Sequence, residues 1–96
     1  MRRSKTISLK EAIQDYIREM NLEDKLKEAG LINSWKDTVG NAIASRTTRI
    51  YIKDKTLYVH LSSSVVRNEL MMLKKALMDK LNEKGGGEVI NEIILK

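Results

Sequence analysis

The chain has 96 residues, a net charge of +5 and an isoelectric point near 9.6, with 42% hydrophobic and 32% charged residues. This length suits one folded domain, and the composition excludes a disordered tail. No apolar run approaches the roughly 18 residues of a membrane span or forms a secretory signal. Cysteine is absent, which excludes disulfides and thiolate metal sites, so we expect a cytoplasmic protein without a membrane partner. The positive charge favours polyanionic partners.

The first helix is marked by its N-terminal cap. Ser8 and Glu11 form a Ser-x-x-Glu capping box, and apolar residues follow it at spacings of three and four. This pattern predicts a helix over residues 9–20, at the start of a single domain over residues 8–96. Residues 1–7 precede the domain as a basic arm, whose cations are Arg2, Arg3 and Lys5.

The second helix carries the only tryptophan of the chain. Asn21 is placed to cap this helix, and the apolar stripe from Leu22 and Leu26 onward passes through Gly30 without a change of phase. Trp35, Val39 and Ile43 then recur at intervals of four residues, so they lie above one another. We therefore expect one nearly continuous helix, with the tryptophan close to its C-terminal end.

A β-hairpin follows, because the apolar period changes from 3.6 to 2 after residue 47. A two-residue turn at Asp54-Lys55 places every apolar pair on one face, and a four-residue loop is the alternative. The predicted apolar pairs are Ile52–Leu57, Ile50–Val59 and Thr48–Leu61. The opposite face then carries the pairs Tyr51–Tyr58 and Arg49–His60.

The last third of the chain predicts a long helix and a final strand. The serines at 62–64 supply a cap, apolar residues over 66–81 form one stripe, and three glycines at 85–87 end the helix. Residues 88–95 are rich in β-branched residues and predict a strand parallel to its predecessor. The fold class is therefore α+β, in the order α-α-β-β-α-β, with helices on one face of a three-stranded sheet and the other face open.

A catalytic site is not predicted. His60 is the only histidine and cysteine is absent, so neither a catalytic triad nor a metal site of several such ligands can be assembled. The glycines at 85–87 are followed by Glu-Val-Ile and not by Lys-Ser/Thr, which excludes a phosphate-binding P-loop. We predict a protein that is not an enzyme and requires neither a cofactor nor a metal.

The open face of the sheet is the candidate functional surface. Its tyrosines can stack on bases while neighbouring cations contact phosphates, as in proteins that bind single-stranded nucleic acid. The alternative is a solvated face whose cross-strand pairs stabilise the hairpin. The candidate residues of this face are Arg49, Tyr51, Lys53, Tyr58 and His60. A positive track could extend from them over the arm (Arg2, Arg3, Lys5) and over Arg67, Lys74 and Lys75.

Several short motifs occur in a fixed order along residues 22–95. They are Trp35-Lys-Asp-Thr-Val39-Gly40, Ile43-Ala44, Thr47, Leu57-x-Val59-x-Leu61-x-Ser63-Ser64, Glu69-Leu70 and the leucine-rich helix that follows. In this order and spacing the sequence resembles the DciA-like family of bacteria. The resemblance implies a KH-like α+β fold in a bacterial cytoplasmic protein. It also implies a DNA-binding protein of DNA replication that assists loading of the replicative helicase.

Two features of related proteins are absent from the sequence. Some relatives carry a zinc ribbon, which a chain without cysteine cannot form. No Gly-x-x-Gly loop is present, so a KH-like fold does not by itself imply the clamp with which KH domains hold a nucleic-acid backbone. Two alternatives to a DNA-binding adaptor stay open: an RNA- or ribosome-associated module that uses the same surface, and a pure protein-interaction module.

Three apolar residues are candidates for contact with a protein partner. Trp35 could anchor a partner if its ring is buried along one edge only; the alternative is a core ring that holds the second helix on the hairpin. Met71 and Met78 are seven residues apart and could form an adaptable binding surface. The alternative for both methionines is packing at the edge of the core.

Overall fold

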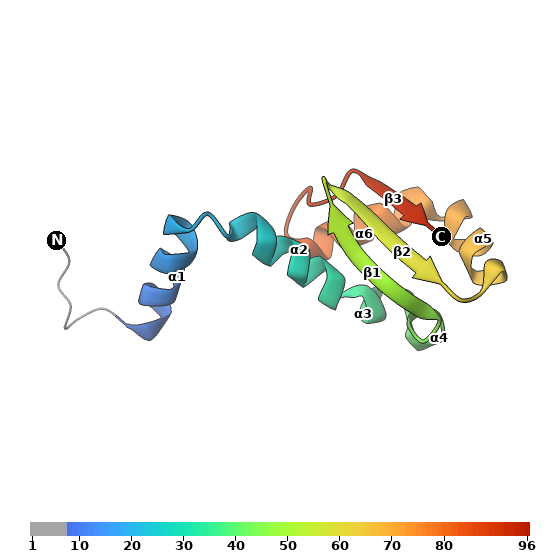
Figure 1. The fold of residues 1–96 in the computed structure, drawn as a ribbon, viewed down its shortest axis with the longest axis horizontal. Coiled ribbons are helices and arrows are strands. Elements are labelled where there is room, and N and C mark those ends of the chain that lie inside the picture. Colours follow the sequence, from blue (N-terminus) through green and yellow to red (C-terminus); the bar gives the residue numbers. More distant parts are fainter. Residues whose placement is uncertain (1–7) are drawn as a thin grey trace.

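The computed structural model describes residues 8–96, which form six helices and a three-stranded sheet (Figure 1). Helices pack on one face of the sheet, which confirms the predicted α+β class and is compatible with a KH-like fold. Within this range no helix combines the length and apolar character that crossing a lipid bilayer requires. The predicted arm residues Arg2, Arg3 and Lys5 lie outside the described residues.

The elements are α1 (Leu9–Glu19), α2 (Glu23–Asn33), α3 (Trp35–Val39), α4 (Asn41–Ala44), β1 (Thr47–Lys53), β2 (Thr56–Leu61), α5 (Ser64–Met72), α6 (Lys74–Gly85) and β3 (Glu92–Leu95).

The sheet has the order β1-β2-β3, with β1 and β2 antiparallel and β2 and β3 parallel. The parallel pair confirms the predicted strand-helix-strand crossover, which here runs through α5 and α6. Figure 1 shows α6 passing behind the sheet. On the covered face Leu57, Val59 and Ile93 are buried, whereas Tyr58 alternates with them and lies on the open face.

The register of the hairpin agrees with the prediction at four positions and differs at one. The pairs Ile52–Leu57, Tyr51–Tyr58, Ile50–Val59 and Arg49–His60 are confirmed. Asp54 and Lys55 have φ values of 52° and 60°, as a two-residue type I′ turn requires. The predicted pairing of Thr48 with Leu61 is wrong, because an irregularity between Thr47 and Arg49 leaves Thr48 unpaired and brings Thr47 opposite Leu61.

The second helix is continuous through Gly30, as predicted, but it is shorter and begins differently. Asn21 does not cap it: this residue has φ 57°, and Leu22 takes the cap position without a side-chain hydrogen bond. Beyond α2 the helical path bends at Ser34 and ends at Gly40, whose φ of 92° separates α3 from α4. The predicted apolar stripe is also wrong in its first turns, because Leu26 is 52% exposed.

The core lies between the covered sheet face and the helices. Leu31 is the buried residue that α2 contributes to this core, although the predicted apolar stripe did not contain it. The buried residues in the described range are Leu31, Trp35, Leu57, Val59, Leu70, Leu77, Leu81, Ile90 and Ile93.

The long helix predicted over 66–81 is divided into α5 and α6 at Leu73, which has non-helical φ and ψ of −110° and 18°. Leu70 and Leu77, on either side of the bend, are both buried, whereas Leu73 is 59% exposed. Both predicted ends of this region are confirmed. Ser63 caps α5 by accepting a hydrogen bond from the Val66 amide, and Gly86 ends α6 with φ 88°.

The final strand is shorter than predicted, because the segment over residues 88–91 is hydrogen-bonded to a side chain of α6 and not to β2. The Asn82 side chain on α6 accepts hydrogen bonds from the Val89 and Ile90 amides and donates one to the Ile90 carbonyl, at 2.8–3.0 Å. These bonds satisfy backbone groups that would otherwise belong to a strand. Ile90 is thereby fixed in the core, and pairing with β2 begins at Glu92.

Helix α1 agrees with the prediction in position and in its cap. The Glu11 amide donates to the Ser8 hydroxyl, and the Ser8 amide donates to the Glu11 carboxylate, both at 3.1 Å. No residue of α1 is buried. In Figure 1 the helix stands apart from the sheet and the helices that cover it.

Candidate nucleic-acid interface

The open face of the sheet carries a row of stacked rings. The cross-strand pair Tyr51–Tyr58 has a ring-centroid distance of 4.9 Å and an interplanar angle of 13°. The imidazole of His60 lies 6.0 Å from the Tyr51 ring at 27°, and the Arg49 guanidinium carbon lies 4.7 Å from the same ring centroid. The sequence places these side chains together because alternate residues of paired strands share a face.

A second cation reaches this row from β3. Lys96 has its ammonium 5.7 Å from the Tyr58 ring centroid. Its position follows from the parallel pairing of β3, since the Lys96 amide donates to the Val59 carbonyl and the Lys96 carbonyl accepts from the Leu61 amide, both at 2.8 Å. Lys96 was not among the predicted residues of this face, although period-2 alternation from the buried Ile93 signals its outward position. We call Arg49, Tyr51, Tyr58, His60 and Lys96 the aromatic–cation cluster.

The ring faces in this cluster differ in what covers them. Each tyrosine covers one face of the other, and the remaining face of Tyr51 lies beside Arg49. Lys96 lies farther from Tyr58 than Arg49 lies from Tyr51, so the outer face of Tyr58 is the less tightly covered. An exposed cation–π contact contributes only about 0.5–1 kcal/mol, so a flat apolar ligand can displace it.

His60 has a buried polar atom without a hydrogen-bond partner in the described chain, the ring nitrogen Nε2. Its imidazole is held by stacking on Tyr51, while its carbonyl accepts a hydrogen bond from the Thr48 hydroxyl at 3.2 Å. Leaving such an atom unsatisfied costs about 1–3 kcal/mol.

The other predicted cations lie in different surroundings. Lys53 is exposed at the end of β1 and shares the open face by alternation. Lys74 lies on α6 with its ammonium 3.0 Å from a carboxylate oxygen of Glu92; this hydrogen bond, a backbone bond from Ile93 and the charge of Lys74 lower the pKa of Glu92. The ionised partner compensates the charge of Lys74. Arg67 is half-buried on α5, so neither residue adjoins the aromatic–cation cluster by sheet alternation.

Trp35 lies in the core, the position that the second of its two considered roles requires. Its ring is 4% exposed, and its indole nitrogen donates a 2.9 Å hydrogen bond to the Thr47 hydroxyl. That hydroxyl donates in turn to the Ile43 carbonyl at 3.0 Å. The indole and this hydroxyl thus connect α3, α4 and the start of β1. Of the two methionines, Met71 is exposed and Met78 packs against the core.

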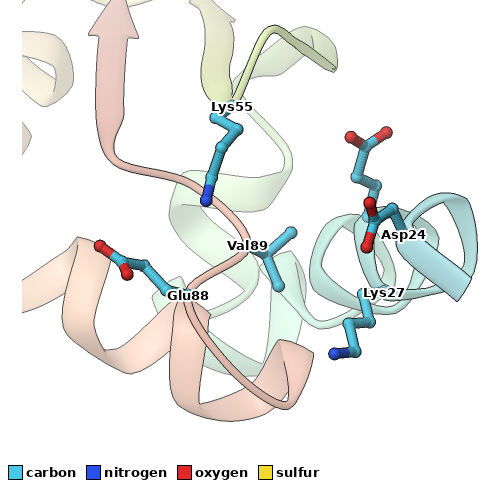
Figure 2. Close-up of a pocket in the computed structure, with 6 residues that line it drawn as sticks. Asp24, Lys27, Lys55, Glu88 and Val89 are labelled. Atoms are coloured by element: carbon cyan, nitrogen blue, oxygen red, sulfur yellow. The ribbon is translucent and has the colours of Figure 1, made fainter.

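A small charged pocket of about 130 Å³ lies where the hairpin turn, α2 and the segment before β3 meet (Figure 2). Lysines and acidic residues alternate around it, and Val89 contributes an apolar side. The Asn91 amide donates to the Lys55 carbonyl at 2.8 Å, which fixes the turn to this segment. In the part of the chain that the structure describes, no group of three or more potential metal-ligating residues occurs. We therefore assign no binding or catalytic role to this pocket.

The comparison with known families matches residues 8–95 to the model described as "Dna[CI] antecedent, DciA". This match covers nearly the whole chain. The chain belongs to the DciA family. This is a family of helicase-loading adaptors and not of enzymes, in agreement with the sequence prediction.

One curated relative of the DciA-family chain is a UPF0232 protein of Corynebacterium glutamicum (strain R). The two sequences are 31% identical over 61 residues, which is 64% of this chain and 34% of the relative. The aligned part of the DciA chain therefore spans about a third of the length of that relative.

Proposed function

We propose that this DciA-family protein is a cytoplasmic, non-enzymatic adaptor that binds single-stranded DNA and assists loading of the replicative helicase. Family membership supports the helicase part of the proposal. The single observation that supports the DNA part is the aromatic–cation cluster, in which two stacked tyrosines lie between cations on a helix-free sheet face. Stacked rings flanked by cations match the two parts of a nucleotide, the base and the phosphate.

Binding on this surface proceeds by extension of the stack. A base takes the outer face of Tyr58, where Lys96 is 5.7 Å from the ring centroid and only loosely held. The displaced ammonium then contacts the adjoining phosphate, and Arg49 performs the same role beside Tyr51. Every base has a π-face, so this mode discriminates little between sequences.

Salt dependence measures the electrostatic part of this proposal. If Arg49, Lys53 and Lys96 each neutralise one phosphate, the logarithm of the binding constant falls with the logarithm of salt concentration with a slope of about −2. Replacing one of these residues by Gln lowers the magnitude of the slope by about 0.7. Lys84→Gln, a change on the exposed end of α6, serves as the matched control and leaves the slope unchanged.

The decisive experiment removes the rings. Tyr51→Ala combined with Tyr58→Ala is expected to weaken binding of a labelled oligothymidine, followed by fluorescence anisotropy, by at least about tenfold, since one stacked base contributes about 1–3 kcal/mol. Tyr16→Ala is the control, because the third tyrosine lies on α1 and outside the cluster. Circular dichroism must show that the double variant remains folded. Unchanged affinity in a folded double variant contradicts the assignment of this face.

The same assay separates the two alternatives. Tighter binding of an oligouridine than of an oligothymidine of equal length, at one salt concentration, favours an RNA-associated module. Absence of affinity for both at low salt favours a pure protein-interaction module. The helicase partner is tested independently by co-purification of the replicative helicase with the tagged protein from a bacterial lysate, with and without nuclease, because only a direct contact survives digestion.

A further inference from the structure

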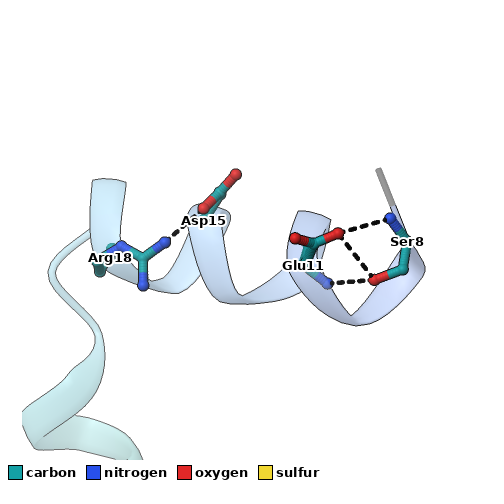
Figure 3. Close-up of polar contacts among 4 residues, drawn as sticks. All are labelled: Ser8, Glu11, Asp15 and Arg18. Carbon is teal, nitrogen blue, oxygen red and sulfur yellow. Dashed lines mark hydrogen bonds and ion pairs between the residues drawn. The ribbon is translucent and has the colours of Figure 1, made fainter. Parts of the chain in front are cut away.

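Helix α1 exposes a row of large apolar side chains that no other part of the described chain covers. Leu9, Ile13, Tyr16 and Met20 lie on one side of the helix at spacings of three and four, and each is at least half exposed. Figure 3 shows the capping box at the start of the helix and the ion pair of Arg18 with Asp15 near its end. These local bonds define the helix, but eleven residues are fewer than an isolated helix in water requires, so α1 gains stability from a packing partner.

An apolar groove of about 420 Å³ lies on the helical side of the molecule. It runs between the α3–α4 and α5–α6 segments, and the bend that exposes Leu73 forms part of its wall. Its principal lining residues are Val39, Ile43, Leu70, Leu73, Leu77 and Lys80. An amphipathic helix that presents side chains at i, i+4 and i+7 is the kind of ligand that such a groove accepts.

The tether prevents α1 from filling the groove of its own chain. Only Met20, Asn21 and Leu22 separate α1 from α2. Folded back along α2, the eleven residues of α1 span about 16 Å, which is the length of α2 itself. The groove begins beyond α2, at Thr38. Along this path most of the apolar row of α1 lies beside α2 and not in the groove, so a helix from a second copy fills the groove more completely than the chain's own α1.

Charges at the edges of the two surfaces are complementary. Glu19 is exposed on α1 and is adjacent to Tyr16 at a spacing of three, at the border of the apolar row. Lys80 lies on the groove and is exposed; its ammonium is 3.9 Å from Glu83, a loose contact that contributes little. A second copy of this chain thus supplies both an apolar helix for the groove and an acidic residue for its basic edge.

We propose that two copies of the chain exchange their α1 helices, each inserting the Leu9–Met20 row into the α3–α6 groove of the other and placing Glu19 against the partner's Lys80. A reciprocal exchange closes on itself as a two-fold dimer. Each helix buries roughly 400 Å² of its own surface and a similar area of groove, so two contacts give about 1,600 Å², the size of a standard stable interface. The contact uses the helical side and leaves the aromatic–cation cluster uncovered, so it is independent of the proposed DNA binding.

The test is the molar mass of the full-length protein, measured by analytical ultracentrifugation at rising concentration. The wild type is expected to pass from monomer to dimer. Ile13→Asp and Leu73→Glu, on the helix and in the groove, each abolish the dimer; both residues are at least half exposed, so circular dichroism is expected to show intact folding. A monomer at every concentration overturns the proposal. A dimer that Ile13→Asp abolishes and Leu73→Glu leaves intact also overturns it, because the helices then pair outside the groove.

Charge reversal identifies the orientation of the helix. Glu19→Lys or Lys80→Glu alone is expected to raise the dimer dissociation constant about tenfold, because each change places two like-charge pairs in the dimer. The two reversals combined restore the wild-type value. Lys84→Glu, one turn beyond Lys80 on α6, is the matched control and is expected to have no effect. Additive losses in the combined variant contradict the proposed pairing.

Discussion

The hydrogen bond between Trp35 and Thr47 makes a quantitative prediction, because it joins the only tryptophan to the first residue of β1. Trp35→Phe removes the 2.9 Å bond to the Thr47 hydroxyl, which costs about 1 kcal/mol, and leaves a small cavity that costs a similar amount. Thr47→Val leaves the indole N–H unpaired in the core, at a cost of about 1–3 kcal/mol. In the Trp35→Phe background no indole N–H remains to be left unpaired. Thr47→Val therefore lowers the free energy of unfolding less there than in the wild type, and we expect a coupling free energy of about 1 kcal/mol.

Chemical denaturation followed by far-ultraviolet circular dichroism measures all four proteins, since tryptophan fluorescence is lost in two of them. A free-energy change of 1 kcal/mol corresponds to about 4–8 °C in Tm for a domain of this size. Trp35→Ala is expected to cost about 3–5 kcal/mol, a large part of the 5–15 kcal/mol typical of a whole domain. Thr48→Val is the control, because Thr48 is exposed and its hydroxyl donates to the His60 carbonyl at 3.2 Å, away from the core.

Additivity of the two single changes would refute the coupling through this bond. A Trp35→Ala variant as stable as the wild type would refute the stronger conclusion that the ring is a core residue. In that case the partner role considered from the sequence would regain its support.

Four further variants test local features of the fold. Asn82→Ala removes three hydrogen bonds to the segment before β3, so denaturation should show a loss of about 2–3 kcal/mol, and hydrogen exchange should be faster in β3. Gly30→Ala should raise the free energy of unfolding by about 0.5–1 kcal/mol, since helix α2 leaves open space for the methyl group, whereas Gly86→Ala should lower it by about 1–2 kcal/mol because φ is 88° there. Asp54-Lys55→Asn-Gly should raise Tm by a few degrees, because both positions have positive φ, and an unchanged Tm would argue against the type I′ turn.

The hairpin could be predicted almost completely from the sequence, for a physical reason. A strand has a side-chain period of two, so a shift of one residue would move Ile50 and Ile52 to the open face. Only one register satisfies the apolar residues of both strands, and it places Tyr51 against Tyr58. The exception at Thr48 arises from the hydrogen bonds that fix Thr47 to Trp35 and Ile43, which link residues distant from the hairpin.

The helix boundaries could not be predicted in the same way. A stripe at spacings of three and four looks alike in one straight helix and in two helices that meet at an angle, so the bend at Leu73 left no signal in the pattern. The break at Gly40, where φ is 92°, was also not predicted, since the stripe Trp35, Val39 and Ile43 continues across it. The anchoring of Ile90 by Asn82 likewise requires that two elements already lie together.

The residues of the candidate site also differ in whether the sequence predicted them. Arg49, Tyr51, Tyr58 and His60 come from the hairpin and follow from its register. Lys96 joins them only through parallel pairing with a strand distant in sequence, and Lys74 is drawn to Glu92 by that same strand. The contacts within the hairpin were therefore predicted from local alternation, whereas the contacts of Lys96 and Lys74 were not, although the parallel strand itself was.

The irregularity at Thr48 has a consequence for solubility. Strand β1 is at the edge of the described sheet, and its outer backbone groups are a template on which another chain could add a strand. A bulge near the start of the strand increases its twist, which shortens the straight stretch that an incoming chain can follow. Arg49 and Lys53 add charge along the remainder. The irregularity thus limits strand addition at the start of β1, and the two charged residues limit it along the rest of that edge.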